Sequence, residues 1–229
     1  GVEHIFAQVG RIDEAEEAIN AGVDYLIAQG REAGGHGLRT ELANSTLPLA
    51  ATLVDLAGRH ESKPMVLAAG GIVNGRGVAS ALALGCDAVV MGTRFVASEE
   101  ASWPLANKQA LLTANADQTI RSQVFDTIAN TYSPCPWPKP YDSTGAFNNS
   151  TAQQWHHDID GLRSQLEKEG PTGPIAKQYK ESGSNPDITG VWMGEGVTEV
   201  KDILSCEEII KTVEGETIQA IRRVQSIVH

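Results

Sequence analysis

The chain has 229 residues, of which 41% are hydrophobic and 21% charged, a composition typical of a folded globular protein. Its formal net charge is -11 and its 18 lysines and arginines are scattered, which argues against a nucleic-acid-binding surface. The sequence contains no run of ~18 apolar residues, the length that a membrane-spanning helix requires, so no membrane partner is expected.

The three cysteines, Cys86, Cys135 and Cys206, lie far apart and form no C-x-x-C motif. This spacing predicts neither a disulfide framework nor a metal site, and it favours a reducing compartment, hence a cytoplasmic location. The chain begins at Gly1 with neither a methionine nor the pattern of a secretory signal peptide, which predicts that a front end is missing.

Four short apolar runs, each followed by a stretch with apolar residues at helical spacing, occupy the first half of the chain. The predicted strands are 5–9, 23–28, 65–69 and 88–91, and the helices expected after them are 12–21, 48–57, 77–84 and 99–114. Gly22, Gly58 and Gly85 are expected to end the first three helices. Strands that are continuous apolar runs are typical of a parallel sheet buried on both faces. The predicted class is α/β, and this pattern alone fits either a doubly wound sheet or a (β/α)8 barrel.

The strand–helix pattern of the sequence ends at about residue 115. Alternating prolines in 131–150 predict an extended connection on the surface. A helix is expected over 153–169, a loop over 170–185, and a C-terminal helix or helix pair over 207–228. The chain is therefore divided into a strand–helix region, 1–115, and a second region, 116–229, whose proline-rich connection and helices pack on the first.

Glycine-rich segments follow the last two predicted strands. One contains Gly70 and Gly71, and the other reads Val90-Met91-Gly92-Thr93. Free backbone N–H groups at these turns, with the Thr93 hydroxyl, would form a phosphate cradle, a common feature after the last two strands of a barrel. The barrel is therefore favoured over the dinucleotide-binding fold, whose glycine spacing is absent. The alternative is that the glycines only make tight turns. For one such turn considered alone, this alternative is about as plausible as a phosphate site.

A third glycine-rich segment, 28–37, follows the second predicted strand and contains His36 between glycines. A histidine in such a loop is poorly placed for core packing, and imidazole suits proton transfer near neutral pH. His36 is the best catalytic candidate. The alternative is a loop histidine that caps backbone carbonyls.

Together these segments resemble the nitronate monooxygenase family, formerly called 2-nitropropane dioxygenases. The resemblance rests on Gln29-Gly30-x-x-Ala33-Gly34-Gly35-His36, Ala69-Gly70-Gly71-Ile72 and Met91-Gly92-Thr93-Arg94-Phe95, in this order. The family is an FMN-dependent (β/α)8 barrel, so the resemblance implies a catalytic base at His36. It also implies FMN contacts at Gln29, Gly34, Gly35, Gly70, Gly71, Val90, Met91, Gly92 and Thr93.

The resemblance further implies that the chain holds only the C-terminal portion of the barrel. A complete barrel has eight strands in ~250 residues, whereas four strands are predicted here. Residues 1–115 would supply the last four βα units and residues 116–229 a helical extension.

The function that the resemblance implies is FMN-dependent oxidation of alkyl nitronates, or nitroalkanes, by molecular oxygen to a carbonyl compound and nitrite. A small-molecule substrate and oxygen are the expected partners, and homo-oligomerisation stays open. Two alternatives stay open as well: an FMN-dependent NAD(P)H reductase of quinones or enoyl thioesters, and a catalytically inactive flavin-binding fragment.

Overall fold

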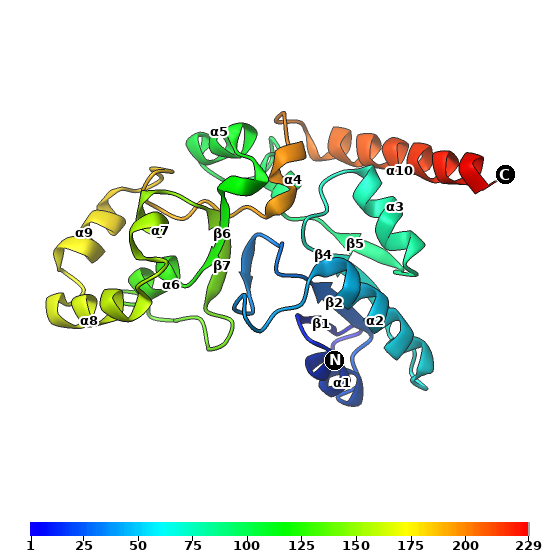
Figure 1. Ribbon diagram of the computed structural model, residues 1–229, viewed down its shortest axis with the longest axis horizontal. Coiled ribbons are helices and arrows are strands. Elements are labelled where there is room, and N and C mark those ends of the chain that lie inside the picture. Colours follow the sequence, from blue (N-terminus) through cyan, green and yellow to red (C-terminus); the bar gives the residue numbers. More distant parts are fainter. Residues whose placement is uncertain (229) are drawn as a thin grey trace.

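A computed structural model describes residues 1–228 of the chain (Figure 1). Within these residues the strands form two sheets, a four-stranded parallel sheet and a three-stranded antiparallel sheet. The parallel sheet contains β1 (Phe6–Val9), β2 (Tyr25–Gln29), β4 (Met65–Ala69) and β5 (Ala88–Val90), and the helices that connect them are α1 (Ile12–Asn20), α2 (Thr46–Arg59) and α3 (Gly75–Ala83). The predicted α/β pattern of the first 91 residues is confirmed to within about three residues at each boundary, and Gly58 lies inside α2 rather than at its end.

The parallel strands lie side by side in the order in which they occur in the sequence. Leu26 of β2 pairs with Ala7 of β1 and Val66 of β4, and Leu67 of β4 pairs with Ala88 of β5. A doubly wound sheet reverses its strand order at a switch point, whereas a barrel adds each strand next to the last. The observed order is the one expected for neighbouring strands of a barrel.

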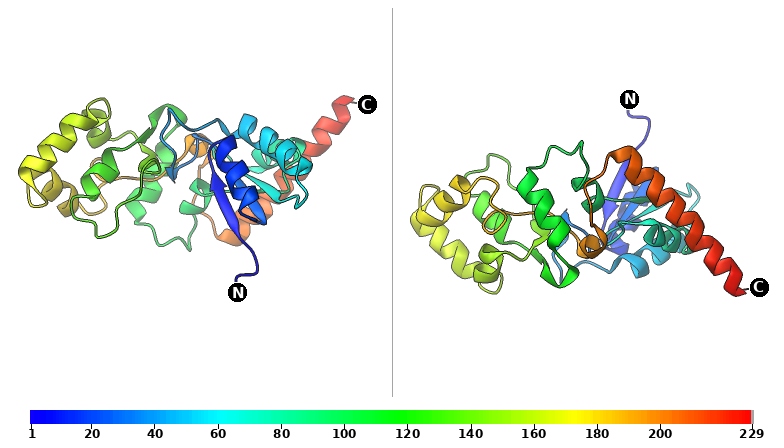
Figure 2. Two further views of the ribbon diagram at one scale, coloured as in Figure 1. Left: turned by 90° about the horizontal axis from the view of Figure 1, so that it is seen from below. Right: turned by 90° about the horizontal axis from the view of Figure 1, so that it is seen from above.

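The two faces of the parallel sheet differ in burial. One face packs against α1, α2 and α3 in a single apolar core that includes Leu26, Leu53 and Val66. On the other face Phe6 is 53% and Met65 44% exposed. The prediction that both faces are buried is therefore wrong for residues 1–228, because helices cover only one of them (Figure 2).

The antiparallel sheet joins segments that are far apart in the sequence. It contains β3 (Gly35–Gly37), β7 (Ser143–Phe147) and β6 (Thr119–Ser122), in that spatial order. Around it pack α6 (Val124–Ala129), α7 (Ser150–Trp155), α8 (Ile159–Glu169) and α9 (Pro174–Glu181). Their buried apolar side chains form a core separate from that of the parallel sheet, with Val124, Ile128 and Leu162 fully buried.

Several predictions for the second half of the chain are wrong. The predicted helix 99–114 begins only at Leu105, as α5 (Leu105–Thr113), because Pro104 precedes it, and a short helix that was not predicted, α4 (Thr93–Val96), lies before this range. The expected extended connection 131–150 contains β7, the predicted helix 153–169 is interrupted between α7 and α8, and the expected loop 170–185 contains α9, which starts at Pro174.

The C-terminal helix α10 (Cys206–Val228) is one continuous helix that packs on α3. The backbone N–H of Gly75, at the start of α3, donates to Glu216 of α10 at 2.8 Å. Beyond this contact the helix lies opposite α3 across a groove, its end projects from the molecule (Figure 2), and Val224 and Ile227 are exposed. None of the helices in residues 1–228 combines the length and the apolar composition needed to cross a bilayer.

Candidate functional site

The loops that follow β2, β4 and β5 meet at the carboxyl-terminal edge of the parallel sheet. The N–H of Gly30 donates to the carbonyl of Ala69 at 2.9 Å, which holds the first loop against the second. Gly71 faces Glu32, so that a Cβ at Gly71 would lie 3.7 Å from the Cβ of Glu32. The glycine-rich segments that the sequence singled out are therefore neighbours in space.

A segment that the sequence analysis did not place in the site, 193–196, links these loops. The N–H of Gly194 donates to the hydroxyl of Thr93 at 3.0 Å, and the N–H of Glu195 donates to the carbonyl of Glu32 at 2.9 Å. Gly196 packs so closely on the carbonyl of Gly71 that an added Cβ would lie 2.5 Å from it. The glycines on both sides of Glu195 are a sequence signal that fits this close packing.

Glycine is required at different positions of the predicted cofactor site for different structural reasons. Gly35 and Gly71 both have φ of +70°, a conformation that side chains rarely adopt. A Cβ on Gly34 would lie 2.7 Å from the backbone of Gly194, so this glycine is required by packing. Gly92 is different: its φ is -100° and no atom lies within 4 Å of a Cβ built on it. Nothing in the described chain requires glycine at 92, whereas a ligand that approaches the backbone would.

A cavity of about 340 Å³ lies beside Gly70 and Gly71, and Glu32, Thr46 and Glu195 contribute to its wall. The carboxylate of Glu32 accepts from the N–H of Thr46 at 3.0 Å and so caps the N-terminus of α2. Burial, followed by the nearby Glu32 carboxylate, raises the pKa of Glu195 above its usual value.

The other predicted cofactor residues on β5 and beyond it lie outside this cavity wall. Val90 is on the open face of the sheet, and Met91 packs against the apolar core. Gly92 is exposed, and Thr93 joins the loops only through Gly194. The structure thus brings Gly70 and Gly71 together at one cavity, with Gly92 and Thr93 at a neighbouring position on the same edge.

His36 lies on β3, opposite Thr144 of β7. Its Nε2 atom is 2.7 Å from Oδ1 of Asp126, a carboxylate that is 5% exposed, and the hydroxyl of Thr144 donates to Oδ2 of the same carboxylate at 2.6 Å. The imidazole stacks on Trp137 with 4.0 Å between ring centroids and meets the edge of Trp192. His36 therefore bonds through its side chain to a buried carboxylate, and it is not a capping residue of backbone carbonyls.

Gln29 supports the backbone of this histidine. Its side-chain amide donates to the carbonyl of His36 at 3.2 Å and accepts from the side chain of Gln8 at 2.9 Å. Gln29 lies at the end of β2 and His36 on β3, so this bond connects the two sheets. A local sequence signal predicted His36 and the family resemblance implied Gln29, but neither pointed to Asp126, which reaches the site through the pairing of β3 with β7.

A buried arginine joins the two sheets at a second point. The guanidinium of Arg121 on β6 donates to the carbonyls of Arg31 at 3.1 Å, Ala33 at 2.6 Å and Ser143 at 3.0 Å. Burial lowers the pKa of Arg121 to about 10. Because all three acceptors are backbone atoms, Arg121 holds the loop after β2 on the antiparallel sheet.

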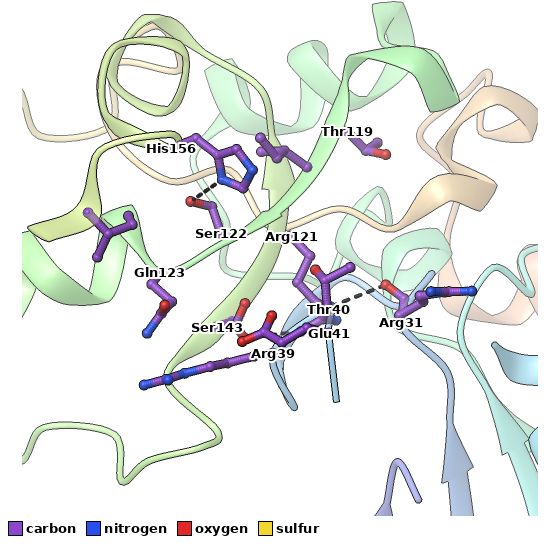
Figure 3. A pocket seen from close by; sticks show the side chains of 12 residues that line it. Arg31, Arg39, Thr40, Glu41, Thr119, Arg121, Ser122, Gln123, Ser143 and His156 are labelled. Carbon is purple, nitrogen blue, oxygen red and sulfur yellow. Dashed lines mark hydrogen bonds between the residues drawn. The ribbon is translucent and has the colours of Figure 1, made fainter. Parts of the chain in front are cut away.

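Beside Arg121 lies a cavity of about 610 Å³ (Figure 3). His156 and Ser122, which are joined by a 3.0 Å hydrogen bond, form one wall, and Arg39 lies on the opposite side. Burial opposes ionisation of Asp142, but hydrogen bonds from Arg39, at 2.8 Å, and from Gln123 bring the pKa of Asp142 below its usual value. The charge of Arg39 is thus neutralised within the protein.

The sequence matches a family model described as nitronate monooxygenase over residues 3–216. The nitronate monooxygenase of Neurospora crassa is 32% identical over 229 aligned positions, which cover 97% of this chain and 56% of the relative. The nitronate monooxygenase of Pseudomonas aeruginosa is 35% identical over 193 positions, covering 74% of this chain and 54% of the relative. The chain spans about half the length of the curated relatives it matches.

Solved structures match over nearly the whole chain. FabK from Thermotoga maritima superimposes with a TM-score of 0.76 at 22% identity, covering 98% of this chain and 64% of FabK. The nitroalkane oxidase from Streptomyces ansochromogenes superimposes with a TM-score of 0.73 at 22% identity, covering 96% of this chain and 59% of the oxidase. These likenesses confirm the predicted α/β class. Since the family model covers most of the sequence and carries its three glycine-rich segments, the chain belongs to the nitronate monooxygenase family.

Proposed function

We propose that the chain serves FMN-dependent oxidation of alkyl nitronates or nitroalkanes by molecular oxygen to a carbonyl compound and nitrite. The observation that carries the proposal is the arrangement of the loop after β2. Near its start, this loop borders the cavity beside Gly70 and Gly71. Past its end, it leads into His36, whose ring is hydrogen-bonded to the buried carboxylate of Asp126. A ligand-binding edge and a proton-accepting group are thereby joined by one short segment.

The residues present fit a flavin phosphate. Gly92 has open space where a side chain would stand, and Gly71 is exposed with a backbone conformation that suits glycine. Gly70, Gly71, Gly92 and Thr93 would hold the phosphate. The family resemblance supports ring contacts at Gln29, Gly34 and Gly35, and backbone contacts at Val90 and Met91. When bound, FMN would accept electrons from the substrate.

We also propose that β1, β2, β4 and β5 correspond to the last four strands of a (β/α)8 barrel. Their sequential order and the helices on a single face support neighbouring positions in a barrel, and the resemblance of the glycine-rich segments to the family supports the last four positions. The division at residue 115 then separates the barrel strands from the extension, although the pairing of β3 with β7 crosses it. The free cysteines Cys86, Cys135 and Cys206 fit a reducing, cytoplasmic environment.

In the proposed reaction His36 removes the Cα proton of a neutral nitroalkane. The Cα–H bond breaks, its proton passes to the imidazole, and the electron pair stays on the substrate as the nitronate. Trp137 and Trp192 cover the ring and limit the access of water to it. Nitronates are already deprotonated and do not need this step.

The test compares His36→Asn with wild type on nitroalkanes and on pre-formed nitronates, both with added FMN. General-base catalysis contributes ~10²- to 10⁴-fold, so turnover of the nitroalkane should fall by that factor and turnover of the nitronate much less. The matched control is His60→Asn, because His60 lies at the end of α2 and its ring contacts only Ser62 among the described hydrogen bonds. Flavin absorbance checks that both variants bind FMN equally.

Other results would contradict the proposal. Equal losses on both substrates would make His36 an orienting residue. Reduction of the flavin by NADH without oxygen, with no turnover of either nitro compound, would favour an NAD(P)H reductase of quinones or enoyl thioesters. Stoichiometric flavin without any turnover would indicate an inactive flavin-binding protein.

A further inference from the structure

The carboxylate of Asp126 decides which nitrogen of His36 is available for chemistry. An ionised carboxylate can only accept hydrogen bonds, and the hydroxyl of Thr144 already donates to its Oδ2 atom at 2.6 Å. The remaining oxygen, Oδ1, lies 2.7 Å from Nε2 of His36. Nε2 must therefore carry a proton to complete this bond, which leaves the lone pair of the neutral ring on Nδ1.

The surroundings of the ring hold it in this orientation. Trp137 stacks on one face of the imidazole at an interplanar angle of 16°, and Trp192 meets it edge-on at 5.9 Å. The backbone of His36 is held by the antiparallel pairing with Thr144 and by the side chain of Gln29. Rotation of the ring by 180° would break the bond to Asp126, so the two nitrogens are not interchangeable.

We infer that Asp126 is a positioning residue that keeps a proton on Nε2 of His36 and thereby makes Nδ1 the proton-accepting atom. This inference rests on the proposed function, in which His36 is the base. In the reaction the Cα proton binds Nδ1 while the Nε2 proton stays between the ring and Asp126. The imidazolium that results has the Asp126 carboxylate as its counter-ion, and Asp126 itself takes up no proton. This is the division of roles known from Ser-His-Asp triads, with the two ring nitrogens exchanged.

The burial of Asp126 strengthens its electrostatic interaction with the His36 ring. A charge pair shielded from solvent is weakened little by dissolved salt, and loss of one partner leaves the other uncompensated. No other acidic group is bonded to His36 in residues 1–228. Substitution at position 126 should therefore change the proton arrangement of the ring even where the fold is kept.

The direct test uses the 229-residue chain with ¹⁵N-labelled histidine. Long-range ¹H–¹⁵N correlation spectra distinguish a protonated ring nitrogen from one with a lone pair, and His36→Asn identifies the signals of this ring. We expect the neutral ring in wild type and in Asp126→Glu to carry its proton on Nε2. In Asp126→Asn, whose amide can also donate, we expect a mixed or reversed tautomer. The matched control is Asp142→Asn, an equally buried aspartate that bonds Arg39 and Gln123 and does not touch His36.

Activity supplies the second measurement. We expect Asp126→Asn to lower kcat for the nitroalkane ~10²- to 10⁴-fold with little change in KM, because proton transfer and not binding is affected. Asp126→Glu should restore part of this loss, and Asp142→Asn should stay near wild type.

Two results would overturn the inference: a proton on Nδ1 of wild type, or an unchanged tautomer in a folded Asp126→Asn variant. Wild type alone can give the first result, so the test does not depend on how well the variant folds. Expected spectra without any turnover would instead reject the proposed function and leave the pairing of Asp126 with His36 intact. Expected turnover losses with an unchanged tautomer would reject the inference and leave the function.

Discussion

The parallel and antiparallel sheets of this molecule are built in different ways. The parallel sheet and its three helices share a core of aliphatic side chains and alanines, and its polar features are backbone groups at glycine turns. The antiparallel sheet and its surroundings bury charged and polar side chains, among them Arg121, Asp126, Asp142 and Thr144. Under the proposed function, the first region would offer its backbone to the cofactor, and the second would supply Asp126, which positions His36.

The largest expected effect concerns the bond between the two regions. Arg121→Met removes a buried guanidinium and leaves three backbone carbonyls without their donor, so the free energy of unfolding should fall by about 3–5 kcal/mol. Urea denaturation measures this loss. Arg11→Met is the control, because Arg11 forms an exposed pair with Asp13, and such surface pairs contribute little to stability. A loss below about 1 kcal/mol for Arg121→Met would show that the two sheets are held together elsewhere.

The second prediction tests whether the parallel region binds FMN through its backbone groups. Gly92→Val should weaken FMN retention by at least about tenfold, since the side chain fills the space that a phosphate would use. Stability should change by less than about 0.5 kcal/mol, because φ at 92 is ordinary and no neighbour is displaced. Gly58→Ala, also in open space but inside α2, is the control and should leave flavin content unchanged. Equal flavin content in both purified variants would argue against the cradle.

The smallest expected effect concerns Glu195, in the segment that crosses the loops. Its pKa is raised in the folded protein, so its charge is a cost to stability at pH 7 that disappears as the pH falls through the folded and then the unfolded pKa. Glu195→Gln should therefore stabilise the protein at pH 7, but by less than about 1 kcal/mol because solvent still reaches much of Glu195 and screens its charge, and the effect should fade near pH 4. Denaturation midpoints of wild type and variant at the two pH values decide the point. A variant that is less stable at pH 7 would show that Glu195 has a partner at this site.

The same comparison explains how much of the structure the sequence could predict. Strands β1, β2, β4 and β5 are local apolar runs bounded by glycines, so their pattern was sufficient. Strand β7, Ser143–Phe147, consists of small and polar residues apart from Phe147, and its burial depends on distant segments that pair with it. Contacts of that range leave no periodic signal in the chain.

The candidate site divides in the same way. His36 and Gly71 stand in glycine-rich loops at strand ends, a local signal that pointed to both of them. No local pattern in the sequence distinguishes Asp126 from other acidic residues on short helices. Its contact with His36 depends on the pairing of β3 with β7. Gly194 and Gly196 are required by close backbone contacts with loops more than a hundred residues away.

The stacking of Trp137 on His36 has an optical consequence. An indole 4.0 Å from an imidazole senses the charge of that ring, because an imidazolium interacts with the electron-rich face of the indole more strongly than neutral imidazole does. Trp137 is half exposed, so its emission is also open to external quenchers. The protein thus carries its own fluorophore beside the candidate base. The emission difference between wild type and Trp137→Phe would follow the proton on His36 without a label and without turnover.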